Sequence, residues 1–284
     1  MSAISIETKK VTELKLITDL ADDDLFPVHN NAGLKTTTLE TLRLAMVANN
    51  AGAHNAIYRG KALGSALTDE QSAAIKAGTF EDLYIGDYWT IGGVNYRIAA
   101  FDYYLNSGDT NCTTHHVVIV PDTCLYNAQM NTSDTTSGGY VGSAMYKSNL
   151  ESAKTTIKSA FSGHVLSKRC YFTNAITSSG APSGGSWYDS EVDLMSERMV
   201  YGNPVFSTMG NGSSDPWGNM HLYTCEKSQL PLFQHEPSCI TNRSTYWLRD
   251  IVTAADFALV NGTGDASNNS ASNSYGVRPA FAIS

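Results

Sequence analysis

The stretch 81-EDLYIGDYWTIGGVNYRIAAFDYY-104 decides how the chain folds, because it contains the clearest β-hairpin pattern in the sequence. Apolar residues alternate with polar ones up to Ile91, a Gly92-Gly93 pair follows, and the alternation resumes from 94 to 98. Alternation with a period of two is typical of a half-buried strand, and a Gly-Gly pair between two such runs favours a tight turn. We therefore expect two antiparallel strands here.

Four further runs predict strands. The run HHVVIVPD (115–122) is apolar on both faces, which is typical of a strand at the centre of a sheet. The other three lie near the end of the chain: TYWLRDIV (245–252), DFALVNG (256–262) and GVRPAFAI (276–283).

Two helices begin with capping-box pairs. Thr68 and Gln71 form the first pair, and the short helix that follows is expected to end at Gly78. Ser148 and Glu151 form the second pair, after which apolar residues keep helical spacing until 163.

A shorter amphipathic helix is predicted in 190-SEVDLMSERMVYG-202, with Val192, Met195 and Met199 on its inner side. Helices mixed with mainly antiparallel strands, without a βαβ rhythm, indicate an α+β fold with long loops.

The first part of the chain differs from the rest. Turn-forming residues at 22–24 and 30–33 separate two short apolar runs, and Leu39, Leu42, Met46 and Val47 then suggest a helix. A segment of this size cannot support its own core. We expect residues 1–50 to be an anchoring or oligomerisation segment and residues 51–284 to be a separate head domain.

The composition disfavours several classes of function. Charged residues make up 16% of the 284, the formal net charge is −8, and no run of Lys or Arg exceeds two residues. Neither a nucleic-acid partner nor an anionic membrane surface is expected. The start of the chain lacks the features of a signal peptide, and no stretch approaches the roughly 20 apolar residues of a membrane-spanning helix. We expect a protein made in the cytoplasm, without membrane insertion.

The five cysteines give no disulfide framework, because their number is odd. Cys112, His115, His116 and Cys124 lie close in sequence and leave zinc binding open as an alternative. However, His115 and His116 open an apolar strand and would point to opposite faces. We expect no metal.

Four carboxylates, Asp189, Glu191, Asp193 and Glu197, cluster in sequence as a glycosidase pair might. On a helix Asp193 and Glu197 would share one face, which we interpret as the ordinary solvated side. The nucleophile-elbow, phosphate-loop, zinc-protease and dinucleotide-binding motifs are absent. We therefore expect no enzymatic activity and no cofactor.

The run 261-NGTGDASNNSASNSY-275 precedes the last apolar strand and consists of small polar residues. It cannot bury enough apolar surface to offset its ordering entropy, so we expect a loop that is either tolerated or functional. Trp187 and Trp217 lie among Gly and Ser, where an indole can stack on a ligand or plug a loop into the core, the plug being the commoner role. The candidate ligand-binding residues are Asn261, Asp265, Ser267, Asn268, Asn269, Ser270, Asn273, Ser274, Tyr275, Trp187 and Trp217.

Arg278 and Trp247 are expected to be structural. Arg is seldom buried without a partner, so we expect a carboxylate, Asp250 or Asp256, beneath Arg278. Pro279 removes one ladder donor, which predicts an edge strand or the start of a strand.

Several of these stretches together resemble a family of bacterial and prophage proteins. The pattern Trp247-Leu248-Arg249, a polar loop and then 276-GVRPAF-281 resembles the C-terminus of that family, and 83–104 with 120–122 fits it as well. The fold of these proteins is similar to the C-type-lectin and formylglycine-generating-enzyme group. The stretch 17–42 resembles the anchoring modules that begin many phage tail-fibre and capsid-fibre proteins.

The resemblance implies a C-type-lectin-like head that carries its recognition surface on loops before the final strand. It also implies a homotrimer, other virion proteins bound through residues 1–50, and location in the virion. The acidic and Asn ligands of the calcium-binding branch are not found, and no cysteine pair follows Cys239, so calcium-dependent binding and oxidase chemistry are not expected.

We expect a phage fibre or receptor-binding protein that recognises a host-surface glycan or protein. Two alternatives stay open. One is a decoration protein of the capsid or tail that binds no ligand. The other is a tail-associated cell-wall hydrolase using Asp189 to Glu197, or His115 and His116, which predicts that one such group lines a pocket with a shifted pKa.

Overall fold

The computed structural model describes residues 25–30, 33–38, 50–207 and 228–284. The chain divides into two compact units, Met1–Ala48 and Asn49–Ser284. The boundary expected at residue 50 lies close to this division.

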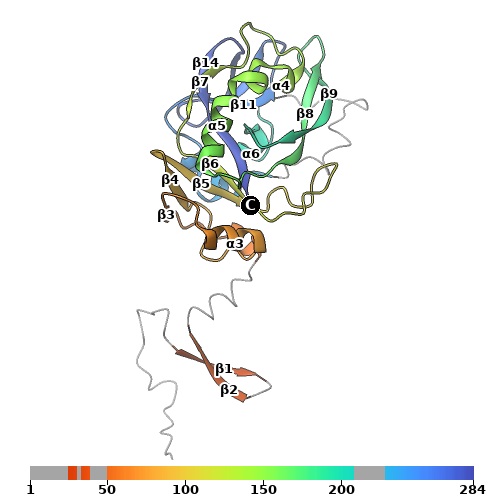
Figure 1. Cartoon of the computed structure of the whole chain (residues 1–284). Coiled ribbons are helices and arrows are strands. Elements are labelled where there is room, and N and C mark those ends of the chain that lie inside the picture. The colour runs from red at the N-terminus through yellow and green to blue at the C-terminus, as the bar shows by residue number, and fades with distance from the viewer. Residues whose placement is uncertain (1–24, 31–32, 39–49, 208–227) are drawn as a thin grey trace, which may run out of the picture. The chain divides into compact units, whose positions relative to one another are not determined.

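The first unit contains a β-hairpin. Strands β1 (Leu25–Asn30) and β2 (Gly33–Thr38) are antiparallel, with Leu25 opposite Thr38 (Figure 1). β1 ends at Asn30 and β2 begins at Gly33, and both residues belong to the stretch 30–33 in which the sequence predicts a turn. The helix expected at Leu39, Leu42, Met46 and Val47 lies outside the described residues.

The second unit, the head domain, contains helices and mainly antiparallel strands, which confirms the α+β class (Figure 1). Its larger sheet has six strands in the order β10-β15-β6-β5-β4-β3, and its second sheet has five in the order β13-β12-β11-β14-β7. Strands β8 and β9 form a separate hairpin. The six-stranded sheet consists of β3 (Ala62–Gly64), β4 (Tyr88–Ile91), β5 (Val94–Phe101), β6 (Val117–Pro121), β10 (Val192–Leu194) and β15 (Pro279–Ile283). The remaining strands are β7 (Tyr126–Gln129), β8 (Lys168–Ile176), β9 (Pro182–Ser190), β11 (Tyr246–Ile251), β12 (Asp256–Val260), β13 (Ala266–Ser270) and β14 (Ser274–Val277).

The helices of the head domain are short. None among the described residues is long and apolar enough to cross a membrane. The helices in the described part of the head domain are α2 (Ala51–Asn55), α3 (Asp69–Ala77), α4 (Gly139–Gly142), the π-helix η2 (Met145–Asn149), α5 (Glu151–Ala160), α6 (Glu197–Tyr201), α8 (Pro231–His235) and the 3-10 helix η3 (Pro237–Cys239).

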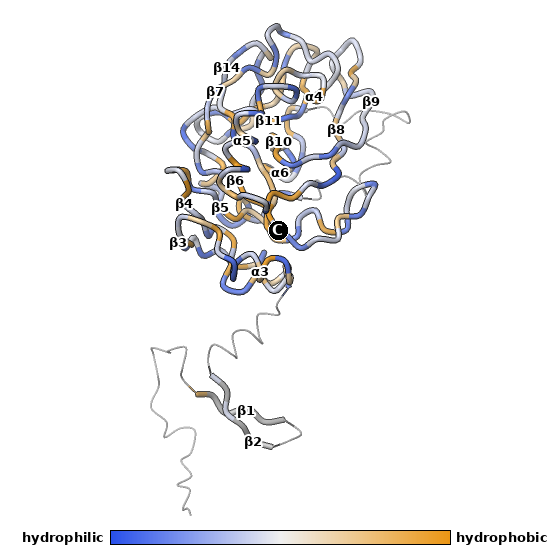
Figure 2. The backbone as a smooth tube through the Cα atoms, in the orientation of Figure 1, coloured by the Kyte–Doolittle hydropathy of each residue, from blue (hydrophilic) through white to orange (hydrophobic). Residues whose placement is uncertain are grey.

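The core forms where the sequence pattern placed it. The expected hairpin is β4 and β5, joined by Gly92-Gly93, and both glycines have positive φ as a tight turn requires. The expected central strand is β6, which lies between β15 and β5 with all five residues buried. Hydrophobic residues gather in these inner strands, whereas many outer connections are hydrophilic (Figure 2).

The first capping box is confirmed and the second is wrong. Thr68 and Gln71 exchange the expected hydrogen bonds at the start of α3, and Gly78 ends the helix in the left-handed conformation. Ser148 instead lies within η2 and donates its hydroxyl proton to the Ala144 carbonyl. A hydroxyl bonded backwards along its own helix cannot cap the next one, so α5 begins without a side-chain cap.

The amphipathic helix expected over 190–202 forms only in the second half of this stretch. Residues 192–194 form β10, which pairs with β15 and places Val192 opposite Phe281. Only 197–201 are helical, with Ser196 as the N-cap that accepts a hydrogen bond from the Met199 N–H at 3.2 Å. Pairing with an apolar strand therefore outweighed the helical spacing here.

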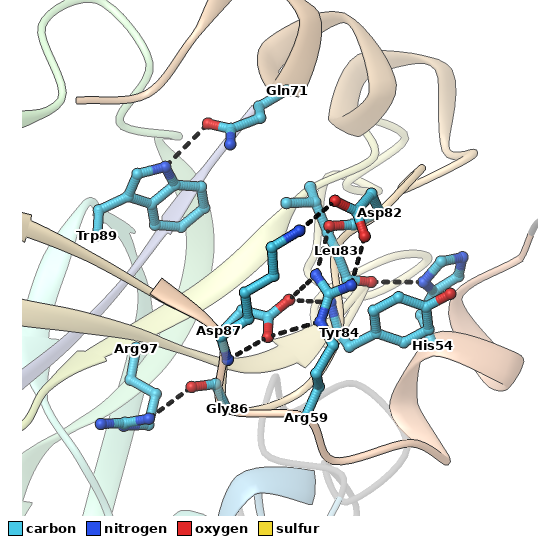
Figure 3. A network of polar contacts seen from close by, with 11 residues as sticks. His54, Arg59, Gln71, Asp82, Leu83, Tyr84, Gly86, Asp87, Trp89 and Arg97 are labelled. Atoms are coloured by element: carbon cyan, nitrogen blue, oxygen red, sulfur yellow. Dashed lines mark hydrogen bonds and ion pairs between the residues drawn. The ribbon is translucent and has the colours of Figure 1, made fainter. Parts of the chain in front are cut away.

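A buried carboxylate ties the beginning of the head domain to its strands (Figure 3). Asp87 is fully buried and accepts hydrogen bonds from the Arg59 side chain at 2.6 and 3.1 Å. It also accepts the backbone N–H groups of Lys61 at 2.8 Å and Tyr84 at 2.9 Å. Arg59 further contacts Asp82. Because the buried charge is paired and fully hydrogen-bonded, this network holds the segment before β3 against the loop before β4.

Arg278 is the single residue between β14 and β15, which belong to different sheets. Its side chain is 1% exposed. It donates to the carbonyl oxygens of Pro121 at 2.8 Å, Ile240 at 3.0 Å and Cys239 at 2.9 Å. It also donates to the Tyr246 hydroxyl at 3.2 Å. The structural role expected for Arg278 thus has a physical basis.

The carboxylate partner expected for Arg278 is wrong. Asp250 accepts the Glu197 N–H, and Asp256 accepts the hydroxyl groups of Thr253 and Ser270. The Arg278 guanidinium is stabilised instead by carbonyl oxygens and by the Tyr246 ring. The centroid of this ring lies 5.1 Å from the guanidinium carbon. Pro279 opens β15, as one of the two predicted positions requires.

We predict that Arg278→Met lowers the free energy of unfolding by about 3 kcal/mol or more, because it leaves several buried oxygen atoms without a donor. Urea unfolding measures this loss. The exposed Arg243 provides the control, and Arg243→Met should stay within about 0.5 kcal/mol of the wild type. Equal effects at both positions would contradict the structural role of Arg278.

Candidate functional site

Seven of the 15 residues in the polar run 261–275, expected to be a loop, lie in β-strands, and the other eight connect these strands. Residues 266–270 form β13, which pairs with β12 and places Asn269 opposite the buried Phe257. Residues 274–277 form β14, between β11 and β7. The loop expectation is wrong for these two stretches, because the backbone groups of a polar segment can bond to a neighbouring strand whatever its side chains are, and it holds for 261–265 and 271–273. The buried side chains of β12 supply the apolar contacts that β13 lacks.

Three of the candidate side chains form a hydrogen-bonded group. The amide of Asn269 donates to the Tyr275 hydroxyl at 2.7 Å. The amide of Asn273 donates to the Asn269 side-chain oxygen at 2.9 Å. Asn273 is exposed, while Asn269 and Tyr275 are half-buried. We call residues 266–275 the polar edge, because they run from β13, which is an outer strand of its sheet, to the start of β14.

A buried aromatic residue, Trp247, packs against Tyr275 of the polar edge. The ring of Tyr275 packs on Trp247, with 5.0 Å between centroids. Trp247 is fully buried and donates its indole N–H to the Ala128 carbonyl at 2.9 Å. Tyr275 is therefore held in one orientation while its hydroxyl stays within the polar group.

The other candidates lie in several separate parts of the chain. Asn261 and Asp265 belong to the turn between β12 and β13, where Thr263 donates its hydroxyl proton towards both side chains at 2.7 Å. These hydrogen bonds from Thr263 and Asn261 lower the pKa of the Asp265 carboxyl. Trp187 lies apart on β9 and packs on Tyr171. Trp217 lies outside the described residues.

The remaining candidates lie on the two strands of the polar edge. Ser267, Asn268 and Ser270 belong to β13, and Ser274 is the first residue of β14.

A second feature is a cavity of about 290 Å³ beside β10. Asp189, Glu191 and Asp193 all line it, so the structure brings three of the four sequence-clustered carboxylates to one place. The remaining lining residues are Tyr146, Lys154, Ser167, Ser190 and Val192.

Asp193 lies at the base of this cavity and is only 5% exposed, so the solvated face expected for it is wrong. Its carboxylate accepts hydrogen bonds from the Tyr140 hydroxyl at 3.1 Å and from the Ser190 hydroxyl. Lys168 donates to the Ser190 hydroxyl oxygen at 3.2 Å. Burial raises the pKa of Asp193.

The fourth carboxylate, Glu197, is fully buried and has a different role. It accepts the backbone N–H groups of Val205, Phe206 and Ser207 at 2.9 to 3.0 Å and so fixes this loop. The Glu197 N–H in turn donates to Asp250 at 2.6 Å. Burial first, and then the charge of Glu197, raises the pKa of Asp250 to about 6.

The histidines and cysteines near β6 take separate positions. His115 contacts the Asp102 carboxylate at 2.7 Å through Nδ1, and the buried His116 accepts the Tyr104 N–H at 3.0 Å through Nε2. Burial lowers the pKa of His116 to about 4. Cys124 lies elsewhere and accepts a hydrogen bond from Asn242. Within the described ranges, no three His, Cys, Asp or Glu side chains gather as a metal site would require.

Comparison with known protein families gives a match for part of the chain. Residues 191–284 match a family described as a domain of unknown function, DUF6273. The matched part runs from just before β10 to the end of the chain and includes the polar edge, Trp247 and Arg278. No curated protein and no solved structure matches the chain.

The titration of Asp250 predicts a stability change with pH. In the unfolded chain this carboxyl releases its proton near pH 4, whereas in the folded protein it does so near pH 6. Asp250 therefore stabilises the fold at low pH, and this contribution is lost as the pH rises through 6. Asp250→Asn, which keeps an acceptor for the Glu197 N–H, should gain about 1–3 kcal/mol relative to the wild type between pH 4 and pH 7.

Urea unfolding of both proteins at the two pH values measures this gain. The same change at the exposed Asp69 is the control for the effect of an Asp-to-Asn substitution itself. A stability difference between Asp250→Asn and the wild type that is the same at pH 4 and pH 7 would contradict the raised pKa.

Proposed function

We propose that the chain is a recognition protein of a phage virion, and that its polar edge binds a glycan on the host surface. The observation that carries the proposal is the bonded group formed by Asn269 on the outer strand β13, Asn273 in the turn after it and Tyr275 on β14. Amide and phenol groups offer donors and acceptors at fixed positions, and these pair with sugar hydroxyls at little cost in side-chain entropy.

The charge of the polar edge supports a neutral, hydroxyl-rich ligand. Between 266 and 275 there is no charged residue, and the carboxylates that reach this stretch, Asp134 at Ser272 and Asp256 at Ser270, disfavour an anionic partner. Asn273 and Ser274 are exposed, which leaves them accessible to a large ligand. A host-surface protein is the second class of ligand within this proposal.

The rest of the proposal concerns assembly. Residues 1–50 anchor the chain to other virion proteins, and the protein is a homotrimer. The separate unit Met1–Ala48 is consistent with an anchor that is distinct from the head domain. Light scattering of the full chain reports the oligomeric state, and a monomer would contradict this part of the proposal.

A hydrolase is the second candidate function, because Asp193 is a carboxyl with a raised pKa that lines a cavity. Both oxygens of Asp193 are bonded to hydroxyl groups of the protein itself. We therefore favour a binding role for the head domain. A decoration protein without a ligand is the outcome that remains if the binding test below fails.

We predict that Asn273→Ala reduces binding of the labelled full chain to host cells at least about tenfold, because an exposed amide of the bonded group is lost. Flow cytometry across a panel of bacterial strains measures the binding. The exposed Asn111 in the loop between β5 and β6 provides the control, and Asn111→Ala should bind as the wild type does.

Thermal unfolding of both variants should match that of the wild type, since both positions are exposed. Unchanged binding by Asn273→Ala, on a strain that the wild type binds, would contradict the assignment of the polar edge. Absence of wild-type binding to every strain would favour the decoration role.

A further inference from the structure

The cavity beside β10 has the size of a site for one small ring. Its volume is about 290 Å³, at the lower end of the range for small-molecule sites. Its walls come from η2, α5, the segment before β8, and the turn from β9 to β10, which join at the edge of the six-stranded sheet. The polar edge belongs to β13 and β14 of the other sheet, so the cavity is a separate feature.

The charged groups around the cavity are already paired. Asp189 contacts Arg169 at 3.1 Å, Glu191 contacts Lys158 at 2.5 Å, and Lys154 contacts Glu151 at 2.8 Å. In each pair one partner lines the cavity and the other does not. The cavity therefore needs no ionic ligand to balance its lining, while its carboxylate oxygens still have lone pairs that can accept further hydrogen bonds.

The base of the cavity is rigid and polar. Tyr140, Ser190 and Lys168 form a chain of hydrogen bonds with Asp193, and all four side chains are buried. A site whose polar groups are fixed by the core loses little entropy when a ligand binds.

One wall of the cavity is aromatic. Tyr146 is half-buried and packs against Tyr140 and Phe172, with ring centroids 5.2 and 5.8 Å apart. Burial raises the pKa of the Tyr146 phenol to about 12, so the group is neutral at physiological pH. The Lys154 ammonium, which also lines the cavity, lies 5.8 Å from the centroid of the Tyr146 ring. A phenol ring beside several hydrogen-bonding groups matches the chemistry of a pyranose, which has an apolar face and hydroxyl groups at its rim.

We infer that this cavity binds one monosaccharide unit, as a second carbohydrate site apart from the polar edge. The inference rests on the proposed glycan recognition, to which it adds a subsite for a single ring. Ser167, Ser190 and Glu191 supply hydrogen bonds to the ring hydroxyls, and Tyr146 supplies an apolar contact beside Lys154.

Saturation-transfer NMR on the full chain tests this site with a panel of single sugars: neutral hexoses, an N-acetylhexosamine, a hexosamine and a uronic acid. At least one sugar should bind the wild type. Ser167 is exposed at the rim, so Ser167→Trp should fill the cavity and reduce the signal at least tenfold. The control is Ser162→Trp, because Ser162 is also exposed but does not line the cavity.

Glu191→Gln keeps the shape of the cavity but removes the charge of this one side chain, and it should weaken binding of the same sugar several-fold. This variant keeps the test decisive if Ser167→Trp does not fold. The inference is overturned if no sugar binds the wild type, or if binding survives in both cavity variants.

Asn273→Ala separates this inference from the proposed function. If the cavity is an independent site, this variant should keep the sugar signal while losing cell binding. A sugar signal that Asn273→Ala abolishes and the cavity variants leave unchanged would place the sugar on the polar edge instead. That outcome would overturn the cavity site while supporting the proposed function.

Discussion

The head domain depends on one buried guanidinium. Arg278 stands alone between β14 and β15, so the chain passes from the five-stranded to the six-stranded sheet at this residue. Its donors bond to the end of β6 through Pro121, to Cys239 of η3, and to the neighbouring Ile240. A buried charge is tolerated only when its donors are satisfied, and these oxygen atoms satisfy it only while both sheets hold their places. The side chain thus couples the relative position of the sheets to the stability of the core.

Because Arg278 holds the two sheets together, the outer strand β13 can consist of polar residues. β14 carries Tyr275 immediately before the Arg278 junction, and Trp247 packs beneath Tyr275. β13 contributes little apolar burial of its own, since all five of its residues are only half-buried. The buried residues of β12 and Trp247 provide the stability instead. Side chains of the polar edge are therefore available for recognition, and substitutions at its exposed positions should not unfold the head domain.

Sequence patterns predicted those parts of the fold that local periodicity determines. The β4–β5 hairpin, β6 and α3 follow from spacing within a few residues, and the structure confirms each of them. The strand β13 could not be predicted, because Asn and Ser have low strand propensity and their pairing depends on β12. The burial of Asp193 depends on Tyr140, which is distant in sequence. Arg278 and its acceptor Pro121 are also distant in sequence. The residues around Arg278 therefore do not indicate that its partners are carbonyl oxygens and not a carboxylate.

Hydrogen exchange of the full chain, free and bound to surface polysaccharide from a strain that it binds, tests the central claim most directly. The account predicts slower exchange in 266–277 on binding, because a ligand on the polar edge shields the outer strand and β14. Slower exchange confined to other parts of the chain, with 266–277 unchanged, would contradict the claim that the polar edge recognises the ligand.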